Sequence, residues 1–201
     1  NYNDHLMQEL AQNGNGVAAY IDTLSEAQKV LVNEATSSLF PIAQDVKIQL
    51  EFNPSQVSEY RLLGYETRAL NREDFNNDKV DAGDIGAGHT VTAIYELVLA
   101  NSDSQQIDAL RYSKEAVKEN SSSEFGFLKL RYKLPGETQS RLIEQPITRH
   151  AYDISNNLKR EVSFATAVAG FAELLKGRQY QGDWGYEQAI DLAQANKGDD
   201  L

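Results

Sequence analysis

The chain has 201 residues, of which 41% are hydrophobic and 24% are charged, and its 30 acidic and 19 basic residues give a formal net charge of −11. The acidic balance argues against a surface for nucleic acid or anionic lipid, which needs clustered Lys and Arg. The absence of cysteine excludes disulfides, thiolate metal sites and cysteine nucleophiles. No apolar run approaches the roughly 18 residues of a transmembrane helix.

The N-terminal residues follow the pattern of an α/β fold. A helix is predicted over residues 4–12, and the apolar run at 17–21 is predicted to form a buried strand. Thr23 and Glu26 make a capping box, which opens a second helix that ends before Pro41. Because one strand cannot make a sheet, we expect residues 1–42 to be a piece of a domain.

From Asp45 the hydrophobic pattern changes to a period of two. Apolar residues alternate with polar ones in three clear runs, which places Lys47 on the wet face of its strand. These runs are 46–52, 91–97 and 128–134, and weaker candidates lie at 59–66, 109–113 and 140–147. Each of these strands would have one polar, solvent-exposed face and one apolar, buried face, and no helix lies between them. This pattern predicts a two-sheet antiparallel β-sandwich over residues 43–150. Residues 116–124 are expected to form a mobile loop.

After Tyr152 the period returns to that of a helix. Apolar residues from Leu158 to Leu175 describe one face, and Gly177 stands where a C-terminal cap belongs. The residues expected to be buried on this helix are Phe164, Val168, Phe171 and Leu175. A second helix is predicted over 184–196, so residues 151–201 form a helical tail. The expected fold class is α+β: a sandwich with a C-terminal helical appendage and an N-terminal α/β remnant.

Three stretches carry a resemblance to a known family. The chain opens on N-Y-N-D, continues with A-Y-I-D-T-L-S-E-A at 19–27, and reads E-D-F-N-N-D-K-V-D-A-G-D-I-G-A-G-H-T-V-T-A-I-Y-E at 73–96. These residues resemble bacterial von Willebrand factor A-domain proteins of the YfbK type, in which an A domain precedes a C-terminal domain of unknown function. The resemblance implies that residues 1–42 are the last elements of the A domain. Because the chain does not begin with Met, we expect an internal fragment.

The metal site of the A domain is not carried over to this chain. A domains bind a divalent ion through an Asp-x-Ser-x-Ser loop after their first strand. Here Asp103 is preceded by Ser102 and followed by Ser104, which does not match that motif. No metal-binding residue is therefore assigned from the resemblance.

The acidic stretch before the 91–97 run is the strongest candidate site. Asp74, Asn76 and Asp78 match positions 1, 3 and 5 of a calcium loop of the EF-hand type. Lys79 stands where that loop needs Gly, and Ile85 stands where it needs a bidentate Glu. Further oxygen ligands are available from Asp81 and Asp84. A solvated acidic turn is the favoured interpretation over a calcium site, so no bound ion or cofactor is expected.

The other candidates carry less chemistry. Gly83, Gly86 and Gly88 lack the strand, helix and Lys-Ser/Thr of a phosphate loop, so positive-φ turns explain them better. The three histidines, His5, His89 and His150, share no spacing with a nucleophile, and no catalytic residue is assigned. The aromatic residues Tyr180, Trp184 and Tyr186 either form a binding patch or, as we favour, pack the helical tail against the sandwich.

The function expected from these observations is non-enzymatic. The chain is predicted to be a protein-interaction or scaffolding module that accompanies its own upstream A domain in a bacterial envelope protein and engages a protein partner. The alternative is a metal-dependent protein, calcium-regulated or hydrolytic, that uses residues 73–89. The periplasm or cell envelope is the expected compartment, with the cytoplasm left open.

Overall fold

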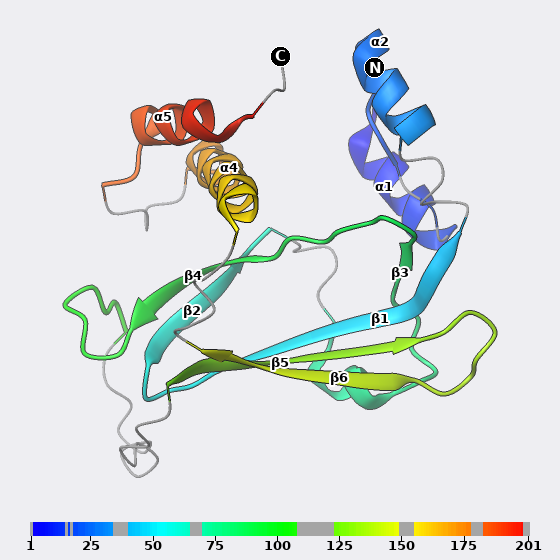
Figure 1. The fold of residues 1–201 in the computed structure, drawn as a ribbon, viewed down its shortest axis with the longest axis horizontal. Helices are drawn as coiled ribbons and strands as arrows, with labels where there is room; N and C mark the ends of the chain where they lie inside the picture. Colours follow the sequence, from blue (N-terminus) through cyan, green and yellow to red (C-terminus); the bar gives the residue numbers. More distant parts are fainter. Residues whose placement is uncertain are drawn as a thin grey trace. The chain divides into compact units, whose positions relative to one another are not determined.

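The computed structural model describes residues 2–14, 16, 18–33, 40–64, 70–107, 123–148, 155–177 and 183–198. It combines helices with antiparallel sheets, so the predicted α+β class is confirmed (Figure 1). Contacts divide the chain into two compact units. One holds Asn1–Leu50, Leu70–Val91 and Leu128–Gln145, and the other holds Glu51–Ala69, Thr92–Phe127 and Pro146–Leu201. The predicted domains at 1–42, 43–150 and 151–201 follow chain order rather than these contacts, and they stay a prediction.

Both N-terminal helices begin after a side-chain cap, and the second begins at the predicted Thr23. Helix α1 (Asp4–Asn13) begins after Asn3, whose Oδ1 accepts the N–H of Leu6 at 3.2 Å. Helix α2 (Leu24–Gln28) begins after Thr23, whose Oγ1 accepts the N–H of Glu26 at 3.1 Å. A π-helical turn, η1 (Lys29–Asn33), continues α2. The rest of the predicted helix, at 34–39, lies outside the described residues.

The predicted buried strand at 17–21 is wrong over the residues that the structure describes. Residues 18–22 form no strand, and Tyr20 is 61% exposed with its ring 5.0 Å from that of Tyr2. An apolar run becomes a strand only where a neighbour pairs with its backbone. The described sheets lie between Pro41 and Thr148, and none of their strands pairs with this segment.

Four strands form the larger sheet, in the order β3-β1-β5-β6. Their bounds are β1 (Pro41–Phe52), β3 (Gly83–Gly86), β5 (Glu124–Lys133) and β6 (Arg141–Thr148). The strands predicted at 46–52, 128–134 and 140–147 are therefore confirmed. Between β5 and β6 the chain turns at Gly136, whose φ of 83° suits glycine, and the Glu137 N–H donates to the Leu134 carbonyl at 2.9 Å. Pro146 lies on the edge strand β6, where a missing N–H is tolerated.

The smaller sheet pairs β2 (Val57–Leu63) with β4 (Ile94–Leu99) in antiparallel register, from Val57 opposite Leu99 to Leu63 opposite Ile94. The strand predicted at 59–66 is confirmed, and the one predicted at 91–97 begins three residues later. Phe52 packs its ring 4.7 Å from Tyr60 and 5.4 Å from Tyr95. The candidate strand at 109–113 lies outside the described residues, as does most of the loop predicted at 116–124. Stacking of the two sheets as a sandwich stays a prediction.

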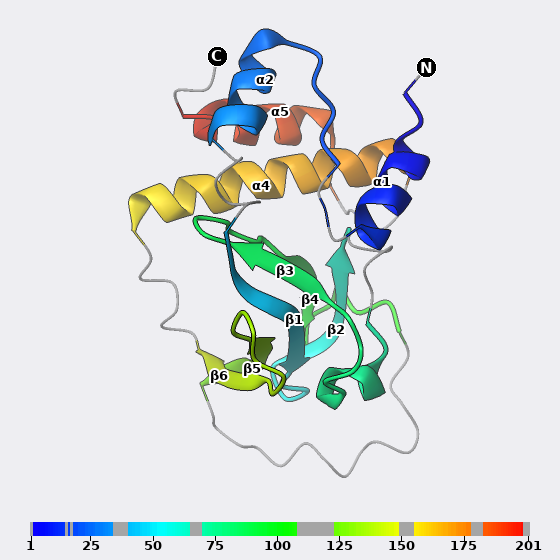
Figure 2. The same cartoon turned by 90° about the vertical axis from the view of Figure 1, so that its right-hand side faces the viewer.

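The helical tail forms where the sequence predicts it. Helix α4 (Asn156–Leu175) begins after Ser155, whose Oγ accepts the Leu158 N–H at 3.3 Å, and it ends before Gly177, whose φ is 67°. Helix α5 (Tyr186–Asn196) lies beside α4 in both views (Figures 1 and 2).

The face of α4 that is buried differs from the predicted one. Val168, Phe171 and Leu175 are 51%, 44% and 66% exposed, so their predicted burial is wrong, while Phe164 is half-buried. The buried positions of this helix are Ala167 and Glu173. Small residues let α5 and its preceding turn approach closely, so packing here follows side-chain size rather than the longest apolar stripe.

Candidate functional site: an acidic loop held by lysines

The strongest candidate site is the acidic loop, defined here as residues 72–84. It begins with the short helix η3 (Arg72–Asn76) and ends in strand β3. Phe75 anchors it, with only 4% of its surface exposed and the Arg131 guanidinium 5.9 Å from its ring centre. Strands β1 and β5 place basic side chains beside the loop, so its acidic residues have basic partners within the fold.

Lys47 holds the end of helix η3. Its ammonium donates to the carbonyl oxygens of Asp74 at 3.2 Å and Asn77 at 2.5 Å, and the residue is only 3% exposed. Each of these carbonyls also accepts a backbone N–H, that of Asn77 and that of Val80, both at 3.2 Å. A cation at the end of the helix also interacts favourably with the helix dipole. The sequence placed Lys47 on the wet face of its strand, which is wrong, because a bulge shifts the register of β1 just before it and Ile48 is exposed instead.

Asp45 stands at that bulge and joins three segments. Its φ of 52° lies in the left-handed region, and the pairing of β1 with β3 shifts between Ala43 and Val46. The Asp45 N–H donates to Asp84 Oδ1 at 3.2 Å, and Asp45 Oδ1 accepts the N–H of Ala82 at 3.3 Å. Its other oxygen, Oδ2, accepts from Lys133 Nζ at 2.5 Å. Asp45 therefore fixes the end of the acidic loop to two strands.

Lys133 and Arg131 complete the attachment from strand β5. Lys133 Nζ also donates to the Asp78 carbonyl at 2.7 Å. The Asp78 carboxylate accepts from Ser140 Oγ at 2.6 Å and from the Ser140 N–H at 3.3 Å, and it lies 3.5 Å from Arg131 Nη1. These Ser140 hydrogen bonds, with help from the positive charges of Arg131 and Lys133, lower the pKa of Asp78.

The carboxyl groups of Asp45 and Asp81 interact and shift in opposite directions. Burial raises the pKa of Asp45, but hydrogen bonds with Lys133, Asp81 and the Ala82 N–H outweigh it, so the pKa of Asp45 lies below its ordinary value. Burial raises the pKa of Asp81, and its hydrogen bond to Asp45 and the negative charge of Asp45 raise it further. Asp45 is therefore the group of the two that gives up its proton first.

An open depression of about 620 Å³ lies over this cluster. Its lining residues are Gln44, Asp45, Asp78, Lys79, Asp81, Asp84, Lys133, Glu137 and Thr138. Carboxylates outnumber ammonium groups in this lining, so the local field favours cations over anions.

The five calcium candidates do not converge on one point. Asp74 accepts from the Asn71 amide at 3.1 Å, and Asn76 Oδ1 accepts from Arg131 at 3.3 Å. Asp78 is bonded to Ser140, whereas Asp81 and Asp84 join Asp45. Within the part of the chain that the structure describes, no three His, Asp or Glu side chains gather in a way that could hold a metal ion.

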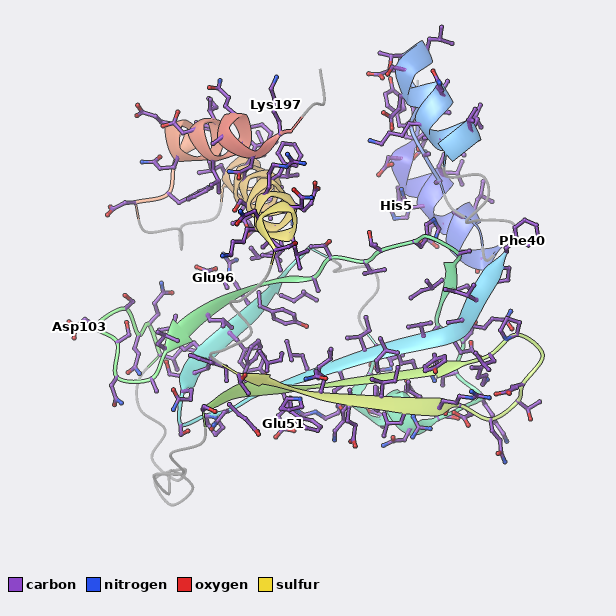
Figure 3. The ribbon with its side chains drawn as sticks, in the orientation of Figure 1. His5, Phe40, Glu51, Glu96, Asp103 and Lys197 are labelled. Atoms are coloured by element: carbon purple, nitrogen blue, oxygen red, sulfur yellow. The ribbon has the colours of Figure 1, made fainter. Side chains whose placement is uncertain are left out.

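The remaining sequence candidates lie on separate elements. Figure 3 shows His5 on α1 and Asp103 in the turn that follows β4. His89 lies just after β3, and His150 lies outside the described residues. Of the three neighbouring glycines, Gly88 has a positive φ, of 82°, whereas the other two, Gly83 and Gly86, begin and end strand β3. The positive-φ explanation is therefore wrong for those two.

Two of the three aromatic candidates pack against helix α4. The indole of Trp184 lies against Gly170, and the ring of Tyr186 meets that of Phe171 at 6.1 Å. Tyr180 lies outside the described residues. Both contacts lie within the helical tail, and the predicted packing of this tail against a sandwich stays a prediction.

Sequence reasoning missed Asp45, Lys47 and Lys133 as members of the site. The alternation of their strands predicted only that charged residues face away from apolar ones. Their convergence depends on the bulge in β1 and on the pairing of β1 with β5, which no local pattern reveals. The one available signal was the excess of acidic residues in the loop, which calls for compensating cations somewhere in the fold.

Comparison with known proteins places this architecture in a family. Residues 37–201 match the family described as "Uncharacterized protein YfbK, C-terminal". The chain belongs to this YfbK C-terminal family. It is also similar to the uncharacterized protein YfbK of Escherichia coli (strain K12), with 44% identity over 202 residues that cover 100% of this chain and 34% of the relative. The chain thus spans about a third of the length of that relative.

The resemblance noted from the sequence is confirmed for the YfbK-type C-terminal region. No solved structure matched the chain. Among the described residues, no helix combines the length and the apolar character needed to cross a membrane.

Proposed function

We propose that this YfbK-type chain is a non-enzymatic interaction or scaffolding module that works beside its own upstream von Willebrand factor A domain in a bacterial envelope protein. In this proposal, residues 1–42 hold the last elements of that A domain, and the remainder of the chain is the module attached to it. The module also engages a protein partner.

The observation that carries the proposal is the exposed apolar surface of the N-terminal segment. Between residues 2 and 32, none of the side chains whose burial the structure describes is buried. Large apolar side chains that stand exposed here are Tyr2, Leu6, Met7, Leu10, Tyr20, Ile21, Leu24, Leu31 and Val32. Contiguous exposed apolar surface marks a site of contact with another protein surface. The family match begins at residue 37, just after this segment, which supports its assignment to a neighbouring domain.

The acidic loop supports the scaffolding half of the proposal. Its carboxylates and carbonyls accept hydrogen bonds from Lys47, Lys133, Arg131 and Ser140. Groups committed to internal partners in this way stabilise the fold and are less available to a substrate. The alternative, a calcium-regulated or hydrolytic protein that uses residues 73–89, has the open depression in its favour.

The proposal is tested by hydrogen exchange on the full-length protein and on this chain alone. We expect the amides of α1 to exchange at least about tenfold more slowly in the full-length protein, because the A domain covers their apolar face. Leu6→Glu with Leu10→Glu should remove that protection, since both side chains are more than half exposed here. Gln8→Glu, on the same helix, is the control that adds one charge without removing an apolar contact.

Equal exchange of α1 in the two proteins would overturn the assignment to the A domain. Loss of protection in the Gln8→Glu control as well would show that added charge, rather than loss of the leucine side chains, is responsible.

A further inference from the structure

The second compact unit contains an ion-pair network that joins a sheet to a helix. Arg61 of β2 lies opposite Glu96 of β4 in the sheet register and forms an ion pair with it through Nε. The Nη1 atom of Arg61 also reaches Glu173 Oε2 of α4 at 2.9 Å. Figure 3 shows the labelled Glu96 on the side of β4 that faces α4. One guanidinium therefore bridges a carboxylate of its own sheet and a carboxylate of the helix.

The two carboxylates differ in their exposure to water. The Glu173 side chain is only 4% exposed, whereas that of Glu96 is 38% exposed and that of Arg61 is 27% exposed. A buried carboxylate is tolerated only where a cation and hydrogen bonds compensate for lost hydration. Arg61 supplies such compensation, with Lys176 3.5 Å away on the helix itself. Without Arg61, Glu173 would lose the positive charge that strand β2 places beside it.

The α4–α5 pair is held together by apolar contacts of its own. Ala167 and Ala189 are 1% and 3% exposed, and Trp184 lies against Gly170. By contrast, large apolar side chains of α4, including Val168 and Leu175, are exposed to solvent. Cohesion between the two helices is therefore apolar, while the contact from α4 to β2 includes an ion pair of which Glu173 is buried and Arg61 is partly exposed. Ion pairs depend on precise geometry, so this contact is lost at a small displacement.

We propose that the Arg61–Glu173 ion pair is a latch that docks the α4–α5 pair on the β2–β4 sheet. When the latch opens, the two helices undock together and keep their own packing. This conformational device is independent of the proposed function of the chain.

The test uses the full chain with two spin labels. Because the chain has no cysteine, Asp103→Cys in the turn after β4 and Glu187→Cys on α5 supply the labelling sites. With Arg61 intact we expect one narrow distance distribution. Arg61→Met should add a second population at longer distance, because Glu173 loses its bridging partner. Trp184 fluorescence should stay unchanged, since Trp184 reports packing between α4 and α5.

Two glutamate variants form a matched pair. Glu173→Gln and Glu96→Gln make the same chemical change to the two partners of Arg61, but only Glu173 lies on α4. We expect Glu173→Gln to broaden the distances and to speed exchange of hydrogen-bonded α4 amides about tenfold or more. Glu96→Gln should leave both measurements close to those of the unmodified chain.

Three results would overturn the latch. Unchanged distances in both Arg61→Met and Glu173→Gln would show that other contacts dock the helices. Loss of helix and of Trp184 packing in Glu173→Gln would show that the ion pair is part of the internal fold of α4–α5. Equal effects of Glu96→Gln and Glu173→Gln would show that the Arg61–Glu96 pair within the sheet, and not specifically the Arg61–Glu173 pair, controls docking.

Discussion

Asp45 carries an unusual combination of backbone and side-chain roles. A left-handed φ costs a non-glycine residue on the order of 1 kcal/mol, and it persists only where surrounding contacts compensate. Here the compensation comes from hydrogen bonds to Ala82, Asp84 and Lys133. The bulge that this conformation creates also turns Lys47 inward, toward helix η3. One strained residue thus organises both lysine contacts of the acidic loop.

The opposed pKa shifts of Asp45 and Asp81 predict a distinct pH dependence of stability. The pKa of Asp81 is raised in the folded chain above its ordinary value of 3.8. The Asp81 side chain therefore contributes its full stabilisation below pH 3.8, and this contribution is lost as the pH rises through the pKa of the folded chain. Asp81→Asn cannot ionise, so its free energy of unfolding should rise relative to the unmodified chain across that window. Denaturant titrations at a series of pH values measure the difference. A difference that does not vary with pH would contradict the assignment.

Asp45 should show the opposite trend. The pKa of Asp45 is lowered in the folded chain below its ordinary value of 3.8. The Asp45 carboxylate therefore stabilises the fold above pH 3.8, and this stabilisation is lost as the pH falls through the pKa of the folded chain. The free energy of unfolding of Asp45→Asn should therefore fall furthest below that of the unmodified chain at neutral pH. The difference between the two free energies should become smaller in acid. The same denaturant series tests this trend, with Asp103→Asn in an exposed turn as the control for removal of one negative charge.

Lys47 should be the most sensitive lysine of the first unit. Lys47→Met keeps the length of the side chain but leaves the carbonyls of Asp74 and Asn77 without this donor, at a cost of about 1–3 kcal/mol. Lys79→Met removes an exposed lysine of the same loop and should change stability by less than about 0.5 kcal/mol. Chemical denaturation measures both variants. Equal losses in the two would show that net charge, and not the buried hydrogen bonds, sets the effect.

At the scale of elements, hydrophobic periodicity predicted strands β1, β2, β4, β5 and β6 and both tail helices. It failed at 17–21, because pairing with a neighbouring strand decides whether an apolar run becomes a strand. It also chose the wrong face of α4, because Ala167 and Gly170 count little in any hydrophobic stripe but allow the closest approach of Trp184 and α5. The acidic loop was found from its composition, whereas its lysine partners come from strands far away in the sequence.

Gly170 gives a direct test of helix packing in the tail. A β-carbon at this position would lie 2.6 Å from Cε2 and 2.7 Å from Cζ2 of Trp184. The clash in Gly170→Ala should therefore cost about 1–3 kcal/mol of stability. The higher helix propensity of Ala offsets roughly 1 kcal/mol of this cost. Thermal unfolding and Trp184 fluorescence measure the effect. In a Trp184→Phe background the smaller ring should relieve the clash, and a loss as large as before would contradict this contact.

At the scale of the whole molecule, buried charged side chains accompany a small set of buried apolar ones. Among the residues described, each compact unit has few buried apolar side chains: Phe75 in the first, and Val57, Ala167 and Ala189 in the second. Buried charged groups, Lys47 and Glu173, stand beside them. Small cores of this kind make polar networks a larger share of stability than usual.

This internal compensation predicts that calcium adds little to global stability. The carboxylates of the acidic loop point to different partners, and the loop lacks the tight turn and bidentate Glu of a calcium loop, so we expect a Kd no tighter than about 1 mM. At that value, about 1 mM calcium stabilises the folded chain by only about 0.4 kcal/mol. Thermal unfolding with and without calcium, together with calorimetric titration, measures both quantities. The control is Asp74→Asn with Asp78→Asn, which should leave the small calcium response unchanged. Micromolar binding that this double substitution abolishes would instead establish the acidic loop as a calcium site and favour the calcium-regulated alternative.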